Sequence, residues 1–451
     1  MKCKYHNLPP NIIIKISAAI FLFIFTSLSF NACSTFSLME KPAFIKVNGT
    51  QFELNGQPYY FEGANLWYAV YLGASGSIGD RPRLIRELDF LQSMGITNLR
   101  IIGASEQSYI GMALSPGIIK KPDDYNNDLL DGLDFLLSEM KKRNMYAVIF
   151  LTNTWKWSGG MSQYNTWAGD STSVDPSIDY NHFMNYSASF YRNTKAQQLY
   201  THNIYNIITR KNKYDGLYYY EDPTIMSWQL ANEPRPGNGA ESLKWLDEYY
   251  RWINSTAQFI HVLDHNHLVS TGSEGLAGSL DSVQIYLNAH KSKYIDYLTF
   301  HLWPKDWGWY DANRADSTYP LSLEKAIAYI DEQIRLARTL NKPVVMEEFG
   351  LPRDGGIKNK AATTTMRDKY FNKILSLVCD SASGGTPITG ANFWFWAGEG
   401  APQNEHYQWG FGNEMRGVDN FNSIYSSDTT TINILKNYAQ KLNALDEKLK
   451  K

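Results

Sequence analysis

The chain contains Trp228-Gln229-Leu230-Ala231-Asn232-Glu233-Pro234, a short apolar run that ends in an acidic residue. A second run of the same kind, Val344-Val345-Met346-Glu347-Glu348-Phe349-Gly350, lies further along the sequence. Both runs have the composition of buried strands, and a carboxylate at the end of a buried strand is costly unless it is paired or used. The two runs therefore predict strand-end acids that serve one site.

Strands and helices alternate through the rest of the chain. Strand patterns fall near residues 59–65, 97–102, 145–152, 225–232, 267–271, 296–302, 343–348 and 391–396, and helical patterns near 82–94, 129–140, 181–210, 242–264, 326–337, 362–379 and 430–449. The pairs Asn48-Gly49 and Asn55-Gly56 predict a hairpin before the first strand. This order predicts an α/β fold, a (β/α)8 TIM barrel with an N-terminal β-hairpin, enlarged loops on the catalytic face and its active site at the strands' C-terminal ends.

Side-chain alternation along each strand predicts which residues face the barrel interior. In the sixth strand the apolar residues share the side that faces the helices. The same reasoning on other strands gives inward-facing Arg100, Ser227, Gln229, Thr299, His301, Trp303, Asn392, Trp394 and Trp396. In the seventh strand alternation alone does not decide between Glu347 and Glu348.

Composition indicates which ligands suit the chain. A formal charge of -2 and a pI near 6.5 supply no basic stripe for nucleic acid. Aromatic residues reach 14%, with 13 Trp and 30 Tyr, and several cluster in the loops that follow the third and sixth strands. Sugars present flat C–H faces to such rings, and two carboxylates are the minimal machinery that cleaves a glycosidic bond. The chemistry predicted for the site is therefore carbohydrate cleavage.

Two motifs carry a resemblance to glycoside hydrolase family 5. Asn-Glu-Pro at 232–234 and Glu-Phe-Gly at 348–350 occur in the family's order and spacing, and the likeness extends over residues 42–445. The run from Leu151 to Gly160, which includes Trp155 and Trp157, resembles the third-strand loop of the β-mannanases. The resemblance implies a retaining, endo-acting enzyme that cleaves β-1,4-mannosidic bonds in mannan, glucomannan or galactomannan as a monomer without a cofactor or metal.

The resemblance also implies roles for individual residues. Glu233 would be the acid/base and Glu348 the nucleophile, Asn232 would meet the sugar 2-hydroxyl, and Arg100 and His301 would support the nucleophile. Trp394 would lie beneath the sugar whose bond is cut, and the other expected substrate-binding residues are Trp155, Trp157, Trp303 and Trp396. Trp303 is a departure, because the family often has Tyr at this position, and an indole N–H cannot donate from the same place as a phenol.

The chemistry requires different states for the two acids. Glu233 must hold a proton, which apolar walls and a nearby negative Glu348 would favour, whereas Arg100 would keep Glu348 ionised. Glu347 is the rival nucleophile, and the Glu-Phe-Gly match favours Glu348. A family 5 β-1,4-glucanase, or a surface protein that binds glycans without cleaving them, are alternative functions. The histidines at 261–267 and the Asp-rich turn at 123–128 have compositions found in metal sites, but a helix end and a helix cap explain them better.

The N-terminus reads as an export signal. Lys2, Lys4 and Lys15 precede an apolar run from Ile16 to Phe30, and Asn31-Ala32-Cys33 follows. Cys33 resembles the lipidated cysteine of bacterial lipoproteins, although Phe30 and Asn31 depart from the usual motif. We expect a signal peptide over 1–33, a tether over 34–41, one catalytic domain over 42–451, and a secreted or membrane-tethered protein. An uncleaved anchor is the alternative, but Lys15 leaves fewer than the roughly 20 apolar residues that span a bilayer.

Overall fold

The structure of the 451-residue chain is a computed structural model. It describes residues 43–110, 113–170, 174–357, 362–399, 401–403, 406–408 and 421–445. Residues 42–451 form one compact unit. The expected signal peptide, the tether and Cys33 lie outside the described residues. Within the described ranges no helix combines the length and apolar character needed to cross a membrane.

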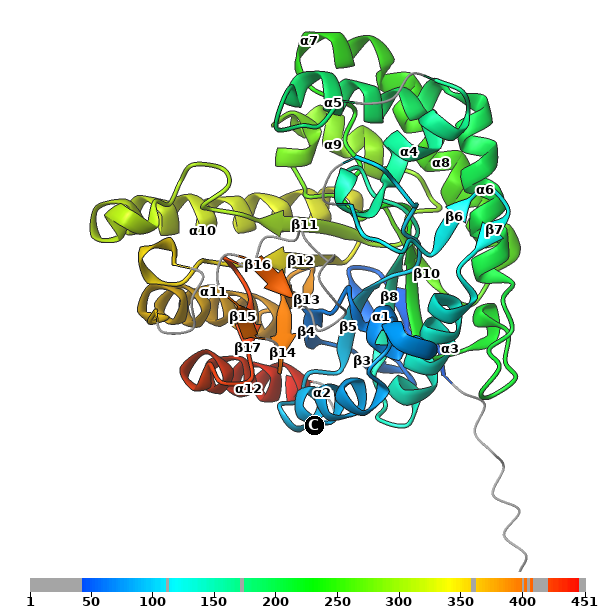
Figure 1. Ribbon diagram of the computed structural model, residues 1–451. Helices are drawn as coiled ribbons and strands as arrows, with labels where there is room; N and C mark the ends of the chain where they lie inside the picture. The colour runs from blue at the N-terminus through cyan, green and yellow to red at the C-terminus, as the bar shows by residue number, and fades with distance from the viewer. Residues whose placement is uncertain are drawn as a thin grey trace, which may run out of the picture. The chain divides into compact units, whose positions relative to one another are not determined.

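Eight parallel strands form the central sheet, as the alternating pattern predicted (Figure 1). They are β4 (Phe61–Asn65), β5 (Asn98–Ile102), β8 (Tyr146–Phe150), β9 (Ile225–Gln229), β10 (Leu268–Ser270), β11 (Leu298–Leu302), β12 (Val344–Phe349) and β13 (Ile388–Phe393). The Asp296 N–H, just before β11, donates to the Val269 carbonyl of β10 at 2.8 Å, and beyond the end of β10 the Thr299 hydroxyl donates to the Ser273 carbonyl at 2.9 Å and the His301 N–H to the Glu274 carbonyl at 3.2 Å. These bonds link the two outer strands of the sheet, so the sheet forms a (β/α)8 barrel.

Helices connect consecutive barrel strands and pack around the sheet. They are α1 (Ala69–Gly73), α2 (Arg81–Ser93), α3 (Asn127–Lys141), α4 (Gly160–Trp167), α5 (Tyr180–Ala188), α6 (Thr194–Ile208), α7 (Gly239–Ser242), α8 (Leu246–Leu263), α9 (Val283–His290), α10 (Ala315–Leu340), α11 (Thr365–Ser383) and α12 (Thr429–Asn443). The single helix expected over 181–210 is two helices, because the Asn193 side chain accepts the Ala196 N–H at 3.0 Å and caps a new start. Asn126 caps α3 in the same way, which confirms the cap predicted in the Asp-rich turn.

The hairpin predicted from the Asn-Gly pairs closes the N-terminal end of the barrel. It comprises β1 (Lys46–Asn48), β2 (Gln51–Leu54) and β3 (Gln57–Pro58). Gly49 and Gly56 have φ of 60° and 73°, the left-handed region that these tight turns require. Ile45 and Phe52 pack with Phe61, Met226, Tyr297 and Val345, which fill the barrel interior below the catalytic end. The polar residues at the C-terminal end of the barrel therefore lie above a layer of packed apolar side chains.

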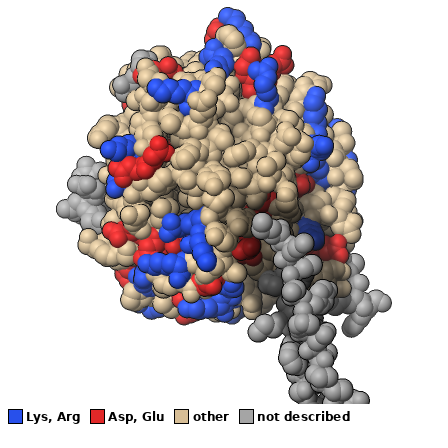
Figure 2. Space-filling view, turned by 90° about the vertical axis from the view of Figure 1, so that its right-hand side faces the viewer, with Lys and Arg blue, Asp and Glu red and all other residues tan. Residues whose placement is uncertain are grey.

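Three short strand pairs and the surface complete the description of the described residues. Small ladders join β6 (Ile119–Lys121) to β7 (Asp124–Tyr125), β14 (Trp396–Gly398) to β17 (Ile424–Tyr425), and β15 (Ala401–Gln403) to β16 (His406–Gln408). Figure 2 shows one face of the molecule, where charges of both signs surround a broad uncharged area. Positive and negative side chains are mixed on this face, so it has no large patch of a single charge.

Candidate active site

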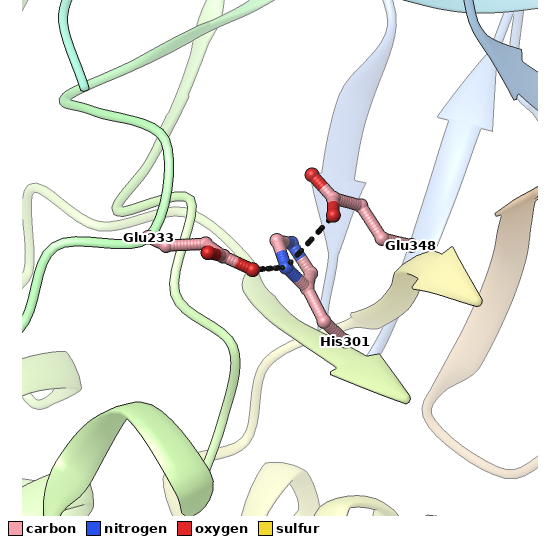
Figure 3. Close-up of side chains that lie close together, drawn as sticks. All are labelled: Glu233, His301 and Glu348. Atoms are coloured by element: carbon pink, nitrogen blue, oxygen red, sulfur yellow. Dashed lines mark hydrogen bonds and ion pairs between the residues drawn. The ribbon is translucent and has the colours of Figure 1, made fainter. Parts of the chain in front are cut away.

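The predicted acids meet at the C-terminal end of the barrel. Arg100 lies in β5, His301 in β11 and Glu348 in β12, and Glu233 follows β9 by a short turn. All four side chains are buried. Figure 3 shows the imidazole of His301 between the carboxyl groups of Glu233 and Glu348. Residues from four separate strands thus converge because parallel strands end at the same edge.

The backbone at Glu233 is held in an unusual conformation. Its φ is 51°, in the left-handed region that non-glycine residues seldom adopt. The Glu233 N–H donates to the Gly272 carbonyl at 2.9 Å, and the Asn232 N–H donates to the Thr152 carbonyl at 2.8 Å. Bonds from the strands on both sides therefore fix a strained turn, as is common at functional sites.

The spacing of the two acids suits a retaining mechanism. One carboxylate oxygen of Glu233, one of Glu348 and the Nδ1 atom of His301 all lie within 4.8 Å of one another. His301 Nδ1 is 2.5 Å from Glu233 Oε1 and 3.4 Å from Glu348 Oε2. Retaining glycosidases hold their carboxyl groups about 5–5.5 Å apart, whereas inverting enzymes need about 6.5–9.5 Å to admit a water molecule. The geometry therefore favours direct attack by one acid on the sugar.

Arg100 is locked against Glu348. Its guanidinium donates directly to Glu348 Oε1, and its Nε donates to Gln229 Oε1 at 2.8 Å. Further bonds run to Asn232 Oδ1 at 2.6 Å and to Asn65 Oδ1 at 3.2 Å. Because these partners fix the plane of the guanidinium, the positive charge stays beside the Glu348 carboxylate.

A register shift in β12 distinguishes Glu347 from Glu348, which side-chain alternation in the sequence could not do. Phe300 pairs with Met346, but the next residue, His301, pairs with Glu348, so Glu347 is an extra residue in the strand. Glu347 consequently points inward as well, at a deeper level, where its Oε1 accepts from Gln229 Nε2 at 2.6 Å. Glu347 Oε2 is 3.5 Å from Arg100 Nε, whereas Glu348 lines the cavity and contacts the guanidinium directly. The geometry thus assigns the accessible position to Glu348.

Burial and the two arginines set the protonation of the acids. Burial raises the pKa of Glu233, and the charges of Arg235 and Arg100 and the Trp155 N–H only partly oppose it. Burial also raises the pKa of Glu348, against the direct contact with Arg100. Two like charges this close disfavour double ionisation, so the pair retains one proton at neutral pH. Since only Glu348 touches a guanidinium, that proton belongs on Glu233.

The pKa of two neighbouring groups shifts in the same sense, toward the neutral form. Burial lowers the pKa of His301 well below its usual range, with Arg100 adding to the effect, so the imidazole is neutral. Burial also raises the pKa of Glu347, against the charge of Arg100 and the hydrogen bond from Gln229. Glu348 differs from these groups in its direct contact with the Arg100 guanidinium, which favours its ionised form.

Aromatic side chains wall the cavity above the acids. It measures about 540 Å³, and Trp155, Trp157, Trp303 and Trp394 line it together with Asn232, Glu233 and Glu348. The Trp155 indole N–H donates to Glu233 Oε2. Trp303 meets the Trp394 ring edge to face, with 6.1 Å between ring centroids. The predicted substrate-binding tryptophans thus gather here, with one exception.

Trp396 does not line the cavity. The last strand ends at Phe393 rather than near 396, and Trp396 begins β14, where it pairs with Ile424 of β17. Its ring is fully buried and stacks on Phe90 of α2, with 5.4 Å between ring centroids. The alternation used to aim Trp396 inward therefore does not apply, because the strand no longer continues there.

Several site residues were missed by the sequence analysis. Arg235 donates to Glu274 Oε2 at 2.5 Å and to the Tyr180 hydroxyl at 3.0 Å, and its guanidinium lies over the Trp155 ring. These residues line the cavity, as does Trp307. Arg235 follows directly after Asn-Glu-Pro, and Glu274 lies just after the fifth strand. Both residues could have been predicted as site residues from the sequence, because they follow barrel strands just as Glu233 does.

A metal ion does not fit this site. Among the described residues, Glu233, His301 and Glu348 form the one cluster with metal-ligand spacing. Arg100 already contacts Glu348 and would place a positive charge beside any cation. The histidines at 261–267 do not converge, since His267 bonds Asp264 and the Asp222 carbonyl, while His261 faces Asp296.

The arrangement can perform a double displacement. A neutral carboxyl at Glu233 can protonate a leaving oxygen, and the ionised Glu348 can attack the carbon that bears it. Both side chains are largely buried at the base of the cavity, and the tryptophans offer flat surfaces to a pyranose ring.

Comparison with known proteins identifies relatives along nearly the whole catalytic domain. Residues 42–447 match the family described as glycoside hydrolase family 5, β-mannosidase-like. A putative mannan endo-1,4-β-mannosidase 4 of Arabidopsis thaliana is 30% identical over 425 residues, which cover 90% of this chain and 93% of the relative.

Solved structures agree with this match. A glycoside hydrolase family 5 mannosidase from Rhizomucor miehei is 33% identical with a TM-score of 0.82, covering 90% of this chain and 99% of that one. A mutant of that mannosidase in complex with mannosyl-fructose is 34% identical with a TM-score of 0.81, and covers 90% and 99% of the two chains.

Proposed function

The chain belongs to glycoside hydrolase family 5, and on this premise we propose that it is a retaining endo-β-1,4-mannanase. Its substrates would be mannan, glucomannan or galactomannan. The observation that carries the proposal is the pair Glu233 and Glu348, whose nearest ligand oxygens lie within 4.8 Å and of which only Glu348 contacts Arg100. A glycan-binding protein without catalysis would have no need of two buried acids in different environments.

Each step of the reaction then has an assigned residue. Glu348 attacks the anomeric carbon while Glu233 gives its proton to the leaving glycosidic oxygen, so the C–O bond breaks as the ester to Glu348 forms. Glu233, now ionised, takes a proton from water that attacks the same carbon. The ester bond breaks, Glu348 is released as a carboxylate, and the product keeps its β configuration.

The preference for mannose is supported by the third-strand loop, by Asn232 and by the names of the relatives. Asn232 lines the cavity, and its Nδ2 donates to Asn153 Oδ1 at 3.1 Å while its Oδ1 accepts from Arg100. An amide held on two sides can read the orientation of a 2-hydroxyl, which is axial in mannose and equatorial in glucose. The wrong epimer would leave buried polar groups unpaired.

The substrate proposal predicts a measurable preference. Hydrolysis of mannan or glucomannan should exceed that of carboxymethyl cellulose by at least about tenfold, which is about 1.4 kcal/mol of differential transition-state binding. Reducing-end release from matched concentrations of each polymer measures it. Equal rates on the two polymers would favour the β-1,4-glucanase instead.

A second candidate is a β-mannosidase that removes single terminal sugars. It is favoured by the R. miehei structure, which bears the name mannosidase and aligns at a TM-score of 0.82. Product profiles at early time points separate the two activities. Oligosaccharides of mixed length indicate internal cleavage, whereas mannose alone from the first minutes indicates terminal cleavage.

Export and anchoring at Cys33 complete the proposal. The support is the apolar run that follows three lysines and ends at Asn31-Ala32-Cys33. Expression of the full chain in a bacterial host should yield enzyme in the membrane fraction, and Cys33→Ser should leave none of it lipid-modified. Mass spectrometry of the mature N-terminus is the direct measurement, and an unmodified Cys33 in the wild-type chain would contradict the anchor.

A further inference from the structure

Glu106 is a buried acid that the proposed mechanism does not use. It follows β5 by a short segment, its side chain is fully buried, and it does not line the cavity above the two acids of the site. Its Oε1 accepts from the Thr152 hydroxyl at 3.0 Å, and its Oε2 accepts from the Gly160 N–H at 2.8 Å. These donors lie near the two ends of the third-strand loop, residues 151–160, so one carboxyl joins both ends of that loop.

The main chain beside this carboxyl packs against the same loop. The Glu106 N–H donates to the Ser158 carbonyl at 2.8 Å. Gly159 has a φ of 86°, and a Cβ at this position would clash with the Glu106 carbonyl oxygen, so the close approach requires glycine. The end of the loop is therefore packed directly on Glu106, which holds it through both its main chain and its side chain.

The third-strand loop connects Glu106 to the proposed acid/base. The Trp155 backbone N–H donates to Asn153 Oδ1 at 3.0 Å, and Asn153 Nδ2 donates to Ser158 Oγ at 3.0 Å. The Trp155 indole N–H donates to Glu233 Oε2. Burial raises the pKa of Glu233, and this indole N–H opposes the rise because it bonds the ionised form. The position of the loop therefore bears on the protonation of Glu233.

The surroundings of Glu106 make a carboxyl costly there. Burial raises its pKa to about 7, and the donors of the loop only partly oppose this rise. Three tyrosines face it, Tyr71 of α1, Tyr164 of α4 and Tyr200 of α6, and burial together with the charge of Glu106 raises the pKa of each, so they stay neutral. These neighbours supply no opposite charge. The loop donors are consequently the main contacts that stabilise the carboxylate.

We propose that Glu106 is a positioning residue for the glycosidic reaction, which holds the third-strand loop so that the Trp155 indole N–H stays on Glu233. The inference rests on the proposed function of Glu233 as the acid/base and adds a residue that acts on it through the loop. Two effects of Glu106 on the pKa of Glu233 have opposite signs: its negative charge would raise that pKa, whereas its hold on Trp155 lowers it.

Removal of the Glu106 side chain tests the sign of this effect. Glu106→Ala should release Trp155 from Glu233, so the alkaline limb of the kcat/KM profile on mannan should move at least about half a unit to higher pH. Loss of the Glu106 charge alone would move that limb to lower pH. The variant should also lower kcat/KM on mannan at least about tenfold at the wild-type optimum, because the loop no longer places Trp155.

Three further variants separate charge, contact and burial. Glu106→Gln removes the charge but can keep both contacts, since its amide oxygen accepts from Gly160 and its N–H donates to the Thr152 hydroxyl, so it should show less than half of the alanine shift. Thr152→Val removes one bond with little change in shape, and should give a smaller upward shift even if Glu106→Ala does not fold. Glu62→Ala is the matched control, because Glu62 is a fully buried glutamate of β4 whose carboxyl bonds none of the described residues. It should leave the alkaline limb in place.

A double variant tests whether the effect passes through Trp155. Trp155→Phe keeps an aromatic ring but removes the indole N–H, so it should reproduce the upward shift, and Glu106→Ala should add no further shift in that background. An unmoved or lowered limb in both Glu106→Ala and Thr152→Val, or a full second shift in the Trp155→Phe background, would overturn the inference.

A readout without turnover separates this inference from the proposed function. Tryptophan fluorescence of the free enzyme should change as the Glu233 carboxyl beside Trp155 titrates, and both Trp155→Phe and Glu106→Ala should remove that transition. A wild-type enzyme inactive on every mannoside would reject the proposed function. The fluorescence titration would still decide the role of Glu106, since an unchanged transition in Glu106→Ala contradicts it.

Discussion

Replacement of Glu348 by alanine should lower kcat on mannan by at least about 10,000-fold, or about 5.4 kcal/mol. The variant retains the proton donor but has no group to form the ester with the sugar. Sodium azide should restore turnover on an activated aryl mannoside, because the anion fits the space left by the carboxylate and attacks from the same face. The product should be the α-mannosyl azide, identified by proton NMR.

Glu347→Ala is the matched comparison for this experiment. Glu347 is the adjacent residue, is equally buried and approaches the same Arg100, but it lies below the cavity and bonds Gln229. Its loss can disturb Arg100, yet no space opens beneath the anomeric carbon. Azide should therefore give no α-mannosyl azide with Glu347→Ala. An azide-rescued Glu347→Ala together with an active Glu348→Ala would reverse the assignment.

The sequence was sufficient to predict the barrel and the convergence of the candidate catalytic groups. Strand-end positions follow from apolar runs of fixed length, and parallel strands bring their ends together whatever the loops contain. Arg100, His301 and Glu233 were found by this reasoning alone. The fold and these three positions follow from the apolar runs of individual strands, which can be recognised in a single sequence.

The register shift at Glu347 was not predictable in the same way. It arises where β12 pairs with β11 on one side and with β13 on the other, since both pairings shift between Met346 and Phe349. Nothing in the composition of the strand marks the extra residue. Alternation within one strand could therefore not decide between the two glutamates, and the family motif was needed.

Trp396 and the Arg235–Glu274 pair depend on contacts between distant segments. Trp396 leaves the barrel because it pairs with Ile424, and Glu274 becomes a site residue because Arg235 reaches it from the preceding strand's end. Period-two alternation describes a strand only while that strand continues. The strand-end positions of Arg235 and Glu274 could be predicted from the sequence, but their contact with each other and the displacement of Trp396 could not be predicted from the periodicity of one segment.

In the proposed mechanism Glu233 differs from Glu348 because it acts through its proton. Burial raises its pKa, so the acid form persists toward neutral pH and activity should fall as pH rises through that raised value. A leaving group that departs without protonation does not require this acid. The loss of activity on removal of Glu233 should therefore depend on the leaving group, whereas the loss on removal of the proposed nucleophile Glu348 should not.

Glu233→Ala should consequently lower kcat/KM on mannan by about 100- to 10,000-fold, the usual contribution of a general acid. On 2,4-dinitrophenyl β-mannoside kcat/KM should remain within about tenfold of the wild type. The alkaline decline that the wild type shows on mannan should be absent in the variant, because the titrating group is gone. Azide should attack the sugar ester of Glu348 from the side that Glu233 vacates, so the product should be the β-mannosyl azide. The anomer measured by NMR thus separates the two glutamates in one assay. An α-azide from Glu233→Ala, or equal losses on mannan and on the dinitrophenyl substrate, would remove Glu233 from the acid/base role.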